Sequence, residues 1–453
     1  MAPTLLFSVF VAINYTCSLH LFSLLAAPQG RASSSPTCCI SNLCRGPAWD
    51  GSKPGKQPGR HMVRSWQQLS RYSSTTKTSS KMDGAWVYLV TGGCGFIGEK
   101  IVELLAQQDY VKEVRVFDSV PREEVEKFTT ATTHVTVMKG DIRDYNLLLA
   151  AMQGAHVVIH TAAIVDYGNT VPFWEMRAVN VGGTENVLRA CCVLNIPYVV
   201  YTSSIAAVGP NTSHEPMFRG NEDTKYSGEV ELPYGKTKAM AEKLVAEANG
   251  RKVQNNGGKL ATCIIRANTV YGEKATFLKD LYLLAKARNG VLNYLEPENT
   301  ERNCTYVGNV AWMHVLAARN LQLKPDLLAG QVYYSYDDTP TRKGFLIRHQ
   351  LLSSMDPSVR LGSRIPYWKM WLIIHLHRII KVLLYPFWKP QPFLNLPLLN
   401  TIVTTFSYET DKASRHFGYK PLFSWAESKQ RTAQWLKATT GNMGSHQLHE
   451  KEN

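Results

Sequence analysis

The segment Trp86-Val-Tyr-Leu-Val-Thr-Gly-Gly-Cys-Gly-Phe-Ile-Gly98 constrains the fold more than any other part of the chain. An apolar strand leads directly into glycines 92, 95 and 98, where a helix is expected to begin. Gly92 allows a tight turn, Gly95 lets the backbone approach a pyrophosphate, and Gly98 lets the new helix pack closely against the strand. The N-terminus of that helix then faces the phosphates. The segment therefore predicts a bound dinucleotide and places residues 1–85 outside the fold.

An acidic residue after the second expected strand supports the same interpretation over a glycine-rich turn without a ligand. The run Val114-Arg-Val-Phe-Asp118 ends in a carboxylate, about twenty residues past the loop, where such folds contact the ribose. A carboxylate there accepts hydrogen bonds from a ribose 2′-hydroxyl and repels a 2′-phosphate. Asp118 therefore favours NAD over NADP.

Short apolar runs alternate with helical stretches from residue 86 onward. This alternation is typical of parallel βαβ units in a doubly wound α/β sheet, the Rossmann type, whose ligands bind at the carboxyl edge. The expected strands are 86–90, 114–118, 135–138, 157–160, 198–202 and 260–265, and the expected helices lie near 97–108, 145–152, 173–195 and 235–249. We expect an NAD-binding domain over 82–270, a smaller substrate-binding and membrane-associated region over 271–440, and a tail over 441–453.

The first 81 residues differ in composition from the rest of the chain. They carry nine basic residues and one acidic residue, so +8 of the net charge of +14 lies there. Residues 5–27 are largely apolar, but no Lys or Arg precedes them, so the basic start of a signal peptide is missing. Residues 28–81 are rich in Ser, Thr, Arg, Lys and Pro, which is typical of disorder or of a transit-like segment. A targeting extension and an alternative start at Met82 both remain open.

Composition excludes several classes of function for the body of the chain. It has no dense Lys/Arg stripe with interleaved aromatic residues, which argues against nucleic acid as a partner. Its cysteines show neither metal-ligand spacing nor a disulfide framework, which favours a reducing compartment and no metal. The glycosylation sequons at Asn211 and Asn303 are expected to stay unmodified on a cytosolic face.

A serine-tipped strand and a Tyr-x-x-x-Lys pair carry the expected chemistry. The run Tyr201-Thr-Ser-Ser204 ends a strand, and Tyr234-Gly-Lys-Thr-Lys238 opens the next helix. A Tyr and a Lys four residues apart share one helical face, so the lysine charge should lower the pKa of the phenol and make it a proton acceptor. The same spacing occurs at Tyr282/Lys286, Tyr385/Lys389 and Tyr408/Lys412, but none of these follows a serine-tipped strand within the dinucleotide domain.

These residues resemble a known family. From about residue 85 to 437 the chain is similar to the extended short-chain dehydrogenases, and specifically to the 3β-hydroxysteroid dehydrogenase/Δ5-Δ4 isomerases. The stretches RGNEDT (219–224), EANGRKV (247–253) and HFGYKPLFSW (416–425) resemble the branch that oxidises 7α-hydroxylated, cholesterol-derived sterols in bile-acid synthesis. The wider resemblance rests on VTGGCGFIG (90–98), GDIRD (140–144), HTAA (160–163), VNVGGTENV (179–187), PYGKTK (233–238), YVGNVAWMHVLAAR (306–319) and YDDTP (336–340).

The resemblance implies a role for each matching residue. Tyr234 would accept the proton, Lys238 would hold the nicotinamide ribose, and Ser204 would orient the 3β-hydroxyl. The family usually has Arg-Pro near the nicotinamide, where this chain has Arg266-Ala267. The residues implied in NAD binding are Gly92, Gly95, Phe96, Ile97, Gly98 and Asp118, with Asp141 and Ile142 flanking the adenine and Asn180 supporting the lysine.

Isomerisation needs a second acid or base, because a proton must move from carbon 4 to carbon 6 of the sterol. In the family, the region matching Tyr333 and Asp337-Asp338 is linked to that step. An Asp-Asp-Thr-Pro run is also an ordinary turn. Under the catalytic interpretation, a substitution of Asp337 spares NADH formation while the Δ5-3-ketone accumulates.

A sterol substrate makes a membrane surface an expected partner. Residues 365–388 are the most apolar stretch of the body, interrupted by Lys369, His375, His377, Arg378 and Lys381. On a helical wheel Leu372, Leu376, Ile379, Ile380 and Leu383 share one side, which predicts a basic interfacial helix rather than a spanning one. A buried helix over the substrate pocket is the alternative. We expect an endoplasmic reticulum membrane with a cytosolic active site, with a mitochondrial membrane as the alternative.

The sequence thus predicts a membrane-associated, NAD-dependent 3β-hydroxy-Δ5-steroid dehydrogenase with isomerase activity on cholesterol-derived sterols. The alternatives are the same chemistry on steroid-hormone precursors such as pregnenolone, and a nucleotide-sugar epimerase, which shares the Tyr/Lys pair but has little use for residues 365–388. A non-catalytic NAD-sensing protein is the alternative from another class. The oligomeric state stays open, a homodimer included.

Overall fold

The structure is a computed structural model that describes residues 86–253, 258–383 and 394–449. Residue contacts divide the chain into one unit of Met1–Lys77 with His375–Gln391 and a second of Thr78–Ile374 with Pro392–Asn453. Of the first unit, the described part is the second half of one helix. The predictions for the N-terminal extension and for Tyr385/Lys389 lie outside the described residues.

Seven parallel strands form the central sheet in the order β3-β2-β1-β4-β5-β7-β11. The order reverses between β1 and β4, which is where a doubly wound sheet opens its ligand crevice at the carboxyl ends of the strands. The strands are β1 (Trp86–Thr91), β2 (Val111–Asp118), β3 (His134–Lys139), β4 (Val157–His160), β5 (Tyr198–Ser204), β7 (Ala261–Ala267) and β11 (Gln331–Tyr334). All six predicted strands are confirmed.

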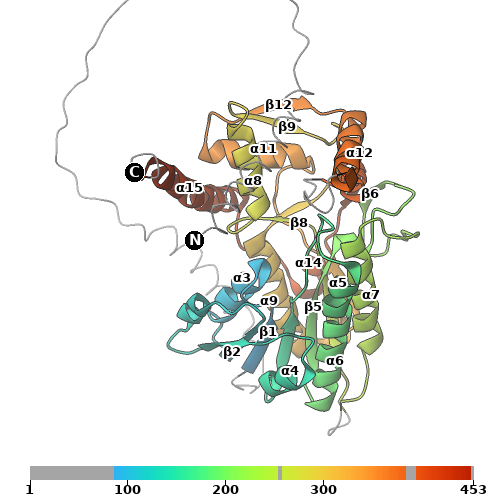
Figure 1. The fold of residues 1–453 in the computed structure, drawn as a ribbon. Helices are drawn as coiled ribbons and strands as arrows, with labels where there is room; N and C mark the ends of the chain where they lie inside the picture. The colour runs from blue at the N-terminus through green and yellow to red at the C-terminus, as the bar shows by residue number, and fades with distance from the viewer. Residues whose placement is uncertain (1–85, 254–257, 384–393, 450–453) are drawn as a thin grey trace, which may run out of the picture. The chain divides into compact units, whose positions relative to one another are not determined.

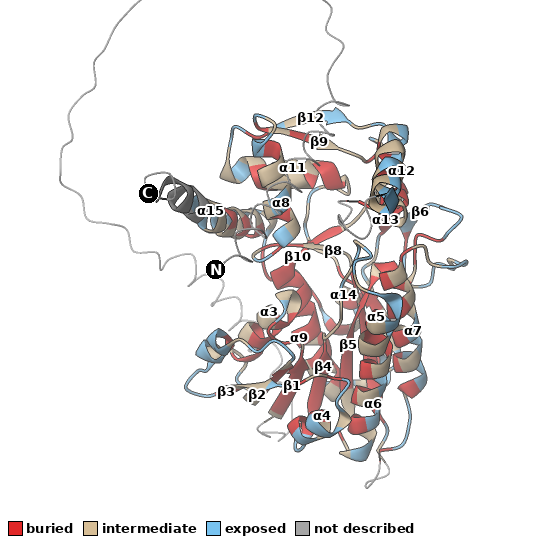
Figure 2. Cartoon of the chain, viewed as in Figure 1, coloured by how far each residue is buried: buried red, intermediate tan, exposed pale blue. Residues whose placement is uncertain are grey.

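Helices cover both faces of this sheet. On one face α3 (Phe96–Leu105) packs against α9 (Val307–Leu323), and α9 contacts β4, β5 and β7 (Figure 1). The other face carries α4 (Tyr145–Met152), α6 (Thr184–Val193) and α7 (Pro233–Ala248). Leu89, Val199 and Ile264 of the strands and Val187 and Val245 of these helices meet in one core of buried side chains. Figure 2 accordingly shows the central strands as largely buried.

Two elements differ from the predicted layout. The expected helix over 173–195 consists of α5 (Phe173–Arg177), a π-helical segment (Ala178–Gly183) and α6. The strand β11 was not predicted, because Gln331–Tyr334 is short and lies within the expected substrate region. Since β11 pairs with β7 and α9 packs on the sheet, residues beyond 270 belong in part to the dinucleotide-binding layers.

The remaining elements are small two-stranded sheets and further helices. The strand pairs are β8 (Thr269–Tyr271) with β10 (Cys304–Tyr306), β9 (Val291–Tyr294) with β12 (Arg360–Arg364), and β6 (Met217–Gly220) with β13 (Phe406–Tyr408). The helices are α8 (Thr276–Lys286), α10 (Pro325–Leu328), α11 (Gly344–Met355), α12 (Tyr367–Leu383), α13 (Leu396–Val403), α14 (Lys412–Phe417) and α15 (Trp425–His449), with 3₁₀ turns at Glu123–Phe128 and Ile205–Ala207.

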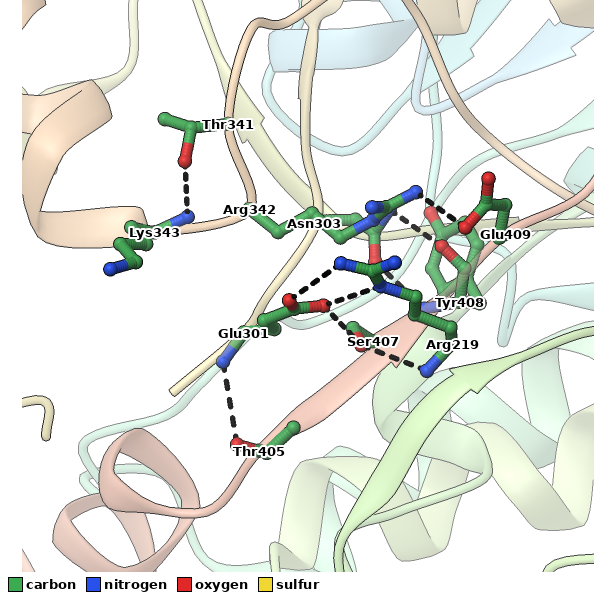
Figure 3. A network of polar contacts seen from close by, with 10 residues as sticks. All are labelled: Arg219, Glu301, Asn303, Thr341, Arg342, Lys343, Thr405, Ser407, Tyr408 and Glu409. Carbon is green, nitrogen blue, oxygen red and sulfur yellow. Dashed lines mark hydrogen bonds and ion pairs between the residues drawn. The ribbon is translucent and has the colours of Figure 1, made fainter. Parts of the chain in front are cut away.

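A polar network fastens β13 to segments distant in the sequence (Figure 3). Arg219 of β6 forms an ion pair with Glu301 at 3.2 Å, and its backbone N–H donates to Ser407 Oγ at 3.0 Å. The Asn303 side chain donates to the carbonyl of Tyr408 at 3.1 Å and accepts from its N–H at 2.9 Å. The side-chain amide of Asn303, the asparagine of one glycosylation sequon, is therefore occupied by hydrogen bonds within the fold. The same holds for Asn211, which is 2 % exposed and donates to Ser227 O at 2.8 Å.

None of the helices within the described residues is both long enough and apolar enough to cross a membrane.

The close approach of α3 to the glycine loop gives a stability prediction. A Cβ on Gly98 would lie 2.1 Å from the carbonyl oxygen of Gly92, so Gly98→Ala forces the helix away from the loop. We expect a loss of about 1–3 kcal/mol in the free energy of unfolding, measured by denaturant titration. Gly182→Ala is the matched control, because a Cβ there meets nothing within 4 Å. Equal stability of the two variants would show that the close approach of α3 to Gly92 does not contribute to the free energy of unfolding.

Candidate active site

The glycine loop at the end of β1 has the geometry of a dinucleotide cradle. Gly92 has φ +69°, and a Cβ on it would lie 2.7 Å from the backbone of Ala162 in the loop after β4. Gly95 is the N-cap of α3, whose first residues are Phe96, Ile97 and Gly98. The loop therefore presents backbone N–H groups and a helix N-terminus with no side chain in the way, which fits a pyrophosphate.

Asp118 ends β2 beside this loop, as predicted. Its carboxylate accepts from the N–H of Cys94 at 3.0 Å and from the N–H of Val120 at 3.0 Å. Each of these bonds occupies one acceptor position of a group that has about four. Acceptor capacity therefore remains for a ribose hydroxyl, and the residues present fit NAD.

The two predicted adenine neighbours, Asp141 and Ile142, lie between β3 and α4. Arg143 pairs with Asp141 at 2.6 Å and holds the pKa of that carboxyl below its usual range. Ile142 is 4 % exposed and packs on Gly183, where a Cβ would lie 2.3 Å from its Cδ1. Arg143 thus holds Asp141 in place, and Gly183 gives Ile142 room to pack. Contact of either residue with adenine stays a prediction.

Ser204 and Tyr234 meet at the carboxyl edge of the sheet. Ser204 is the last residue of β5, and Tyr234 is the second residue of α7. Tyr234 packs against Ala206, two residues after Ser204, and Ser204 and Tyr234 are each 5 % exposed. Gly235 makes this possible, because a Cβ there would lie 2.2 Å from Ala206 O and would hold α7 away from the turn that follows Ser204.

Lys238 lies one turn along α7 from Tyr234 and is 3 % exposed. Its Nζ donates to the carbonyl oxygen of Thr202 at 2.7 Å and lies 4.2 Å from the centre of the Tyr201 ring. Burial lowers the pKa of Lys238 to about 7. Burial raises the pKa of Tyr234. The lowering of this pKa by the charge of Lys238 stays a prediction.

Asn180 connects the catalytic helix to the loop after β4. It lies in the π-helical segment and is 1 % exposed. Its Oδ1 accepts from Ile164 N at 2.7 Å, and its Nδ2 donates to Ile164 O and to Thr237 Oγ1, both at 2.9 Å. Thr237 in turn donates to the carbonyl of Tyr234 at 2.8 Å. The structure thus shows Asn180 positioning the Tyr234 turn, one step removed from Lys238.

Two further polar residues, His160 and Arg266, support the site, and the role of His160 was missed from the sequence. His160 bridges Thr91 Oγ1 at 2.6 Å and Thr184 Oγ1 at 2.9 Å, and burial lowers its pKa to about 3, so the imidazole is neutral. Arg266 pairs with Glu242 of α7 at 2.5 Å. The HTAA stretch contained His160, but no signal distinguished it from a core histidine.

The structure does not bring Tyr333 or Asp337 to Ser204 and Tyr234 through any hydrogen bond of the described residues. Tyr333 lies in β11, fully buried, and its hydroxyl contacts His416 Nδ1 at 3.0 Å. One oxygen of Asp337 accepts from Tyr306 N at 2.8 Å and from Asn309 Nδ2 at 3.0 Å. The other oxygen accepts from the N–H and the hydroxyl of Thr339, at 3.0 and 2.6 Å. Burial raises the pKa of Asp337.

The other described Tyr-x-x-x-Lys pairs have structural surroundings. Tyr282 and Lys286 both contact Asp356, at 2.9 and 3.2 Å. Tyr408 is buried, and its hydroxyl interacts with Asn268 Nδ2 at 2.7 Å. Cysteines 94, 191, 192, 263 and 304 are free thiols, and the described residues contain no cluster that could hold a metal ion.

The hydrogen bonds of Asp337 give a prediction that separates a catalytic role of this residue from a structural one. In Asp337→Asn, one carboxylate oxygen that accepts hydrogen bonds becomes an NH2 group that faces N–H donors. Because bonds at the junction of β10 and α9 are lost, we expect the free energy of unfolding to fall by about 1–3 kcal/mol. Thermal unfolding then shifts down, and NADH formation and isomerisation fall together. A variant of normal stability that forms NADH while the Δ5-3-ketone accumulates would instead assign Asp337 to the isomerase step.

Comparisons with known proteins agree with the candidate active site described above. The model of the 3-beta hydroxysteroid dehydrogenase/isomerase family matches residues 89–366. The 3 beta-hydroxysteroid dehydrogenase type 7 of Homo sapiens is 45 % identical over 361 residues, and that of Mus musculus 44 % over 360, each covering 79 % of this chain and 97 % of the relative.

Solved structures share the fold at lower identity. Pal from Bacillus thuringiensis matches with a TM-score of 0.56 and 19 % identity, over 78 % of this chain and 99 % of that one. The dTDP-glucose 4,6-dehydratase DesIV from Streptomyces venezuelae, solved with NAD, matches with a TM-score of 0.56 and 21 % identity, over 78 % and 98 %. With the glycine cradle, Ser204 and Tyr234 in place, the chain belongs to the 3-beta hydroxysteroid dehydrogenase/isomerase family.

Proposed function

We propose that this protein oxidises the 3β-hydroxyl of Δ5 sterols and isomerises the product to the Δ4-3-ketone, with 7α-hydroxylated cholesterol derivatives as substrates. The coarser part of this statement rests on the family, which makes the chain a 3β-hydroxysteroid dehydrogenase with NAD as its cofactor. The observation that carries the chemistry is the placement of Ser204 at the end of β5 and of Tyr234, which packs on Ala206, at the carboxyl edge where the glycine loop also lies.

The dehydrogenase step assigns one task to each of three side chains. Ser204 holds the sterol 3-oxygen, Tyr234 accepts its proton, and Lys238 binds hydroxyl groups of the ribose through its three donors. Bound NAD supplies the hydride acceptor at carbon 4 of its nicotinamide. Tyr234 begins with a raised pKa because it is buried. The proton transfer therefore needs hydrogen bonds that favour the phenolate, and we assign one of them to Ser204, which acts to lower the pKa of Tyr234.

The substrate proposal rests on the resemblance of three sequence stretches and on the type 7 relatives. We expect the full chain with NAD to form NADH with 7α-hydroxycholesterol at least tenfold faster, by kcat/KM, than with pregnenolone, which corresponds to about 1.4 kcal/mol. Absorbance of NADH and of the conjugated ketone separates oxidation from isomerisation. Tyr234→Phe is the inactive control.

The outcomes of this comparison differ for each part of the proposal. Preference for pregnenolone assigns the same chemistry to steroid-hormone precursors. NADH without conjugated ketone removes the isomerase. NAD binding without turnover of any sterol leaves a non-catalytic NAD-sensing protein.

We also propose that α12 lies on a membrane surface. Several of its apolar side chains are exposed, including Trp368 at 61 %, Ile379 at 54 % and Val382 at 75 %, whereas Met370 and Ile374 are buried. The helix carries Lys369, Arg378 and Lys381 and no acidic residue. Exposed tryptophan and aliphatic side chains combined with basic ones favour insertion of one face between anionic headgroups.

Vesicle flotation tests this proposal. We expect the full chain to float with vesicles that contain a third phosphatidylserine, and Ile379→Glu with Val382→Glu to lower the bound fraction about tenfold or more, because two charges replace apolar contacts. Leu147→Glu with Leu323→Glu is the matched control, since both residues are exposed aliphatics on other helices, at 51 % and 47 %. Equal flotation of the two double variants would contradict a role for α12.

A further inference from the structure

Lys238 is a buried cation, and the two groups that contact its ammonium carry no negative charge. Its Nζ donates to the carbonyl oxygen of Thr202 at 2.7 Å and lies 4.2 Å from the centre of the Tyr201 ring. Glu242 lies one turn further along α7, but its carboxylate is paired with Arg266 at 2.5 Å. Burial of a charge is costly unless other groups compensate for the lost water. The ring of Tyr201 is therefore one of two groups that offset the burial of this ammonium.

The strand β5 fixes the position of the Tyr201 ring. Tyr201 is 1 % exposed, and in the sheet it stands between His160 of β4 and Ile264 of β7. The rings of Tyr201 and His160 lie 5.5 Å apart, centre to centre, at an angle of 34°. His160 is itself held by hydrogen bonds to Thr91 and Thr184. The aromatic face that meets Lys238 is thus part of the rigid sheet.

The ring of Tyr201, and not its hydroxyl, is the part that the site uses. The buried hydroxyl has no hydrogen-bond partner among the described residues. The face of an aromatic ring carries partial negative charge and attracts a cation most strongly where water is excluded. A lysine ammonium has three N–H donors, and Thr202 accepts from one of them. Because the ring offers no lone pair to the ammonium, donors remain for hydroxyl groups of a ligand.

We infer that Tyr201 is a positioning residue for Lys238, whose ring face stabilises the charged ammonium and holds it where it can bind the ribose of NAD. This inference rests on the proposed role of Lys238 in ribose binding. Loss of the ring face makes the charged form of Lys238 less favourable, so the residue should lose its proton at a lower pH. The neutral amine has two N–H donors and no charge, and it should bind the ribose of NAD more weakly.

Few groups around Lys238 can carry a charge. Burial keeps His160 neutral, and Glu242 is compensated by Arg266. Burial also lowers the pKa of Lys238 to about 7, which brings its titration into an accessible range. The titratable and charged groups on α7 and on the strands beside it are Tyr201 of β5, His160 of β4, Arg266 of β7, and Tyr234 and Glu242 of α7.

Titration of the full chain with NAD between about pH 6 and pH 9 tests the inference without a sterol. Tyr201→Leu removes the aromatic face and keeps an apolar side chain. We expect the pH above which NAD affinity weakens to move down by about half a unit to one and a half units, and the affinity at about pH 8 to fall about threefold to tenfold. Tyr201→Phe keeps the face and should change neither quantity.

A matched control and an isosteric variant separate this effect from packing. Tyr110→Leu removes a ring that lies 4.2 Å from the guanidinium carbon of Arg319, just before β2 at the other end of the sheet, and should leave the pH profile unchanged. Tyr201→Phe with three fluorines on the ring keeps the shape but withdraws electrons from the face. It should move the pH profile in the same direction as Tyr201→Leu, with little change in Tm relative to Tyr201→Phe.

A double variant shows whether Tyr201 acts through Lys238. With Lys238→Met, NAD affinity should lose this pH dependence, and Tyr201→Leu should then change it no further. Equal pH profiles of Tyr201→Phe and its fluorinated form, or equal shifts in Tyr110→Leu and Tyr201→Leu, would overturn the inference. A wild-type chain that binds NAD but oxidises no sterol would refute the proposed function alone, whereas one that fails to bind NAD would refute both.

Discussion

Close backbone approach at the carboxyl edge of the sheet is the constraint on which the rest of this structure depends. Four of the glycines where a Cβ would lie within 2.7 Å of a neighbouring atom lie around the site: Gly92 against Ala162, Gly98 against Gly92, Gly183 against Ile142, and Gly235 against Ala206. Each contact joins a helix or loop to the end of a strand. Together they let the dinucleotide cradle, the π-helical segment and the catalytic helix converge on one small region.

Buried polar side chains then fix the orientation of what the glycines bring together. His160 connects the end of β1 to α6, Asn180 connects the loop after β4 to α7, and Arg266 connects β7 to Glu242 of α7. Because an unsatisfied buried polar group is costly, each of these bonds holds its partners to one geometry. Residues that take no part in the reaction thereby fix the orientation of the catalytic side chains.

The sequence predicted the sheet and the principal site well because both depend on local patterns. Strand runs, glycine spacing and the Ser204, Tyr234 and Lys238 positions are each readable within a dozen residues. What it could not predict depends on contacts between distant segments. The direction of Lys238 toward Thr202, the return of β11 to the sheet and the four bonds of Asp337 all involve partners far apart in the chain.

The surroundings of Lys238 have a consequence for ligand binding. Its ammonium is held by a carbonyl and an aromatic face, and burial brings its pKa to about 7, far below the value of about 10.4 of an unfolded lysine. Between these values the unfolded chain binds more protons, so this residue adds stability as pH rises from 7 to 10. A ligand that offers oxygen acceptors to Nζ raises the pKa of Lys238 again, so Lys238 takes up a proton when the ligand binds. Association with such a ligand is therefore coupled to proton uptake near neutral pH, and its affinity weakens as the solution becomes alkaline.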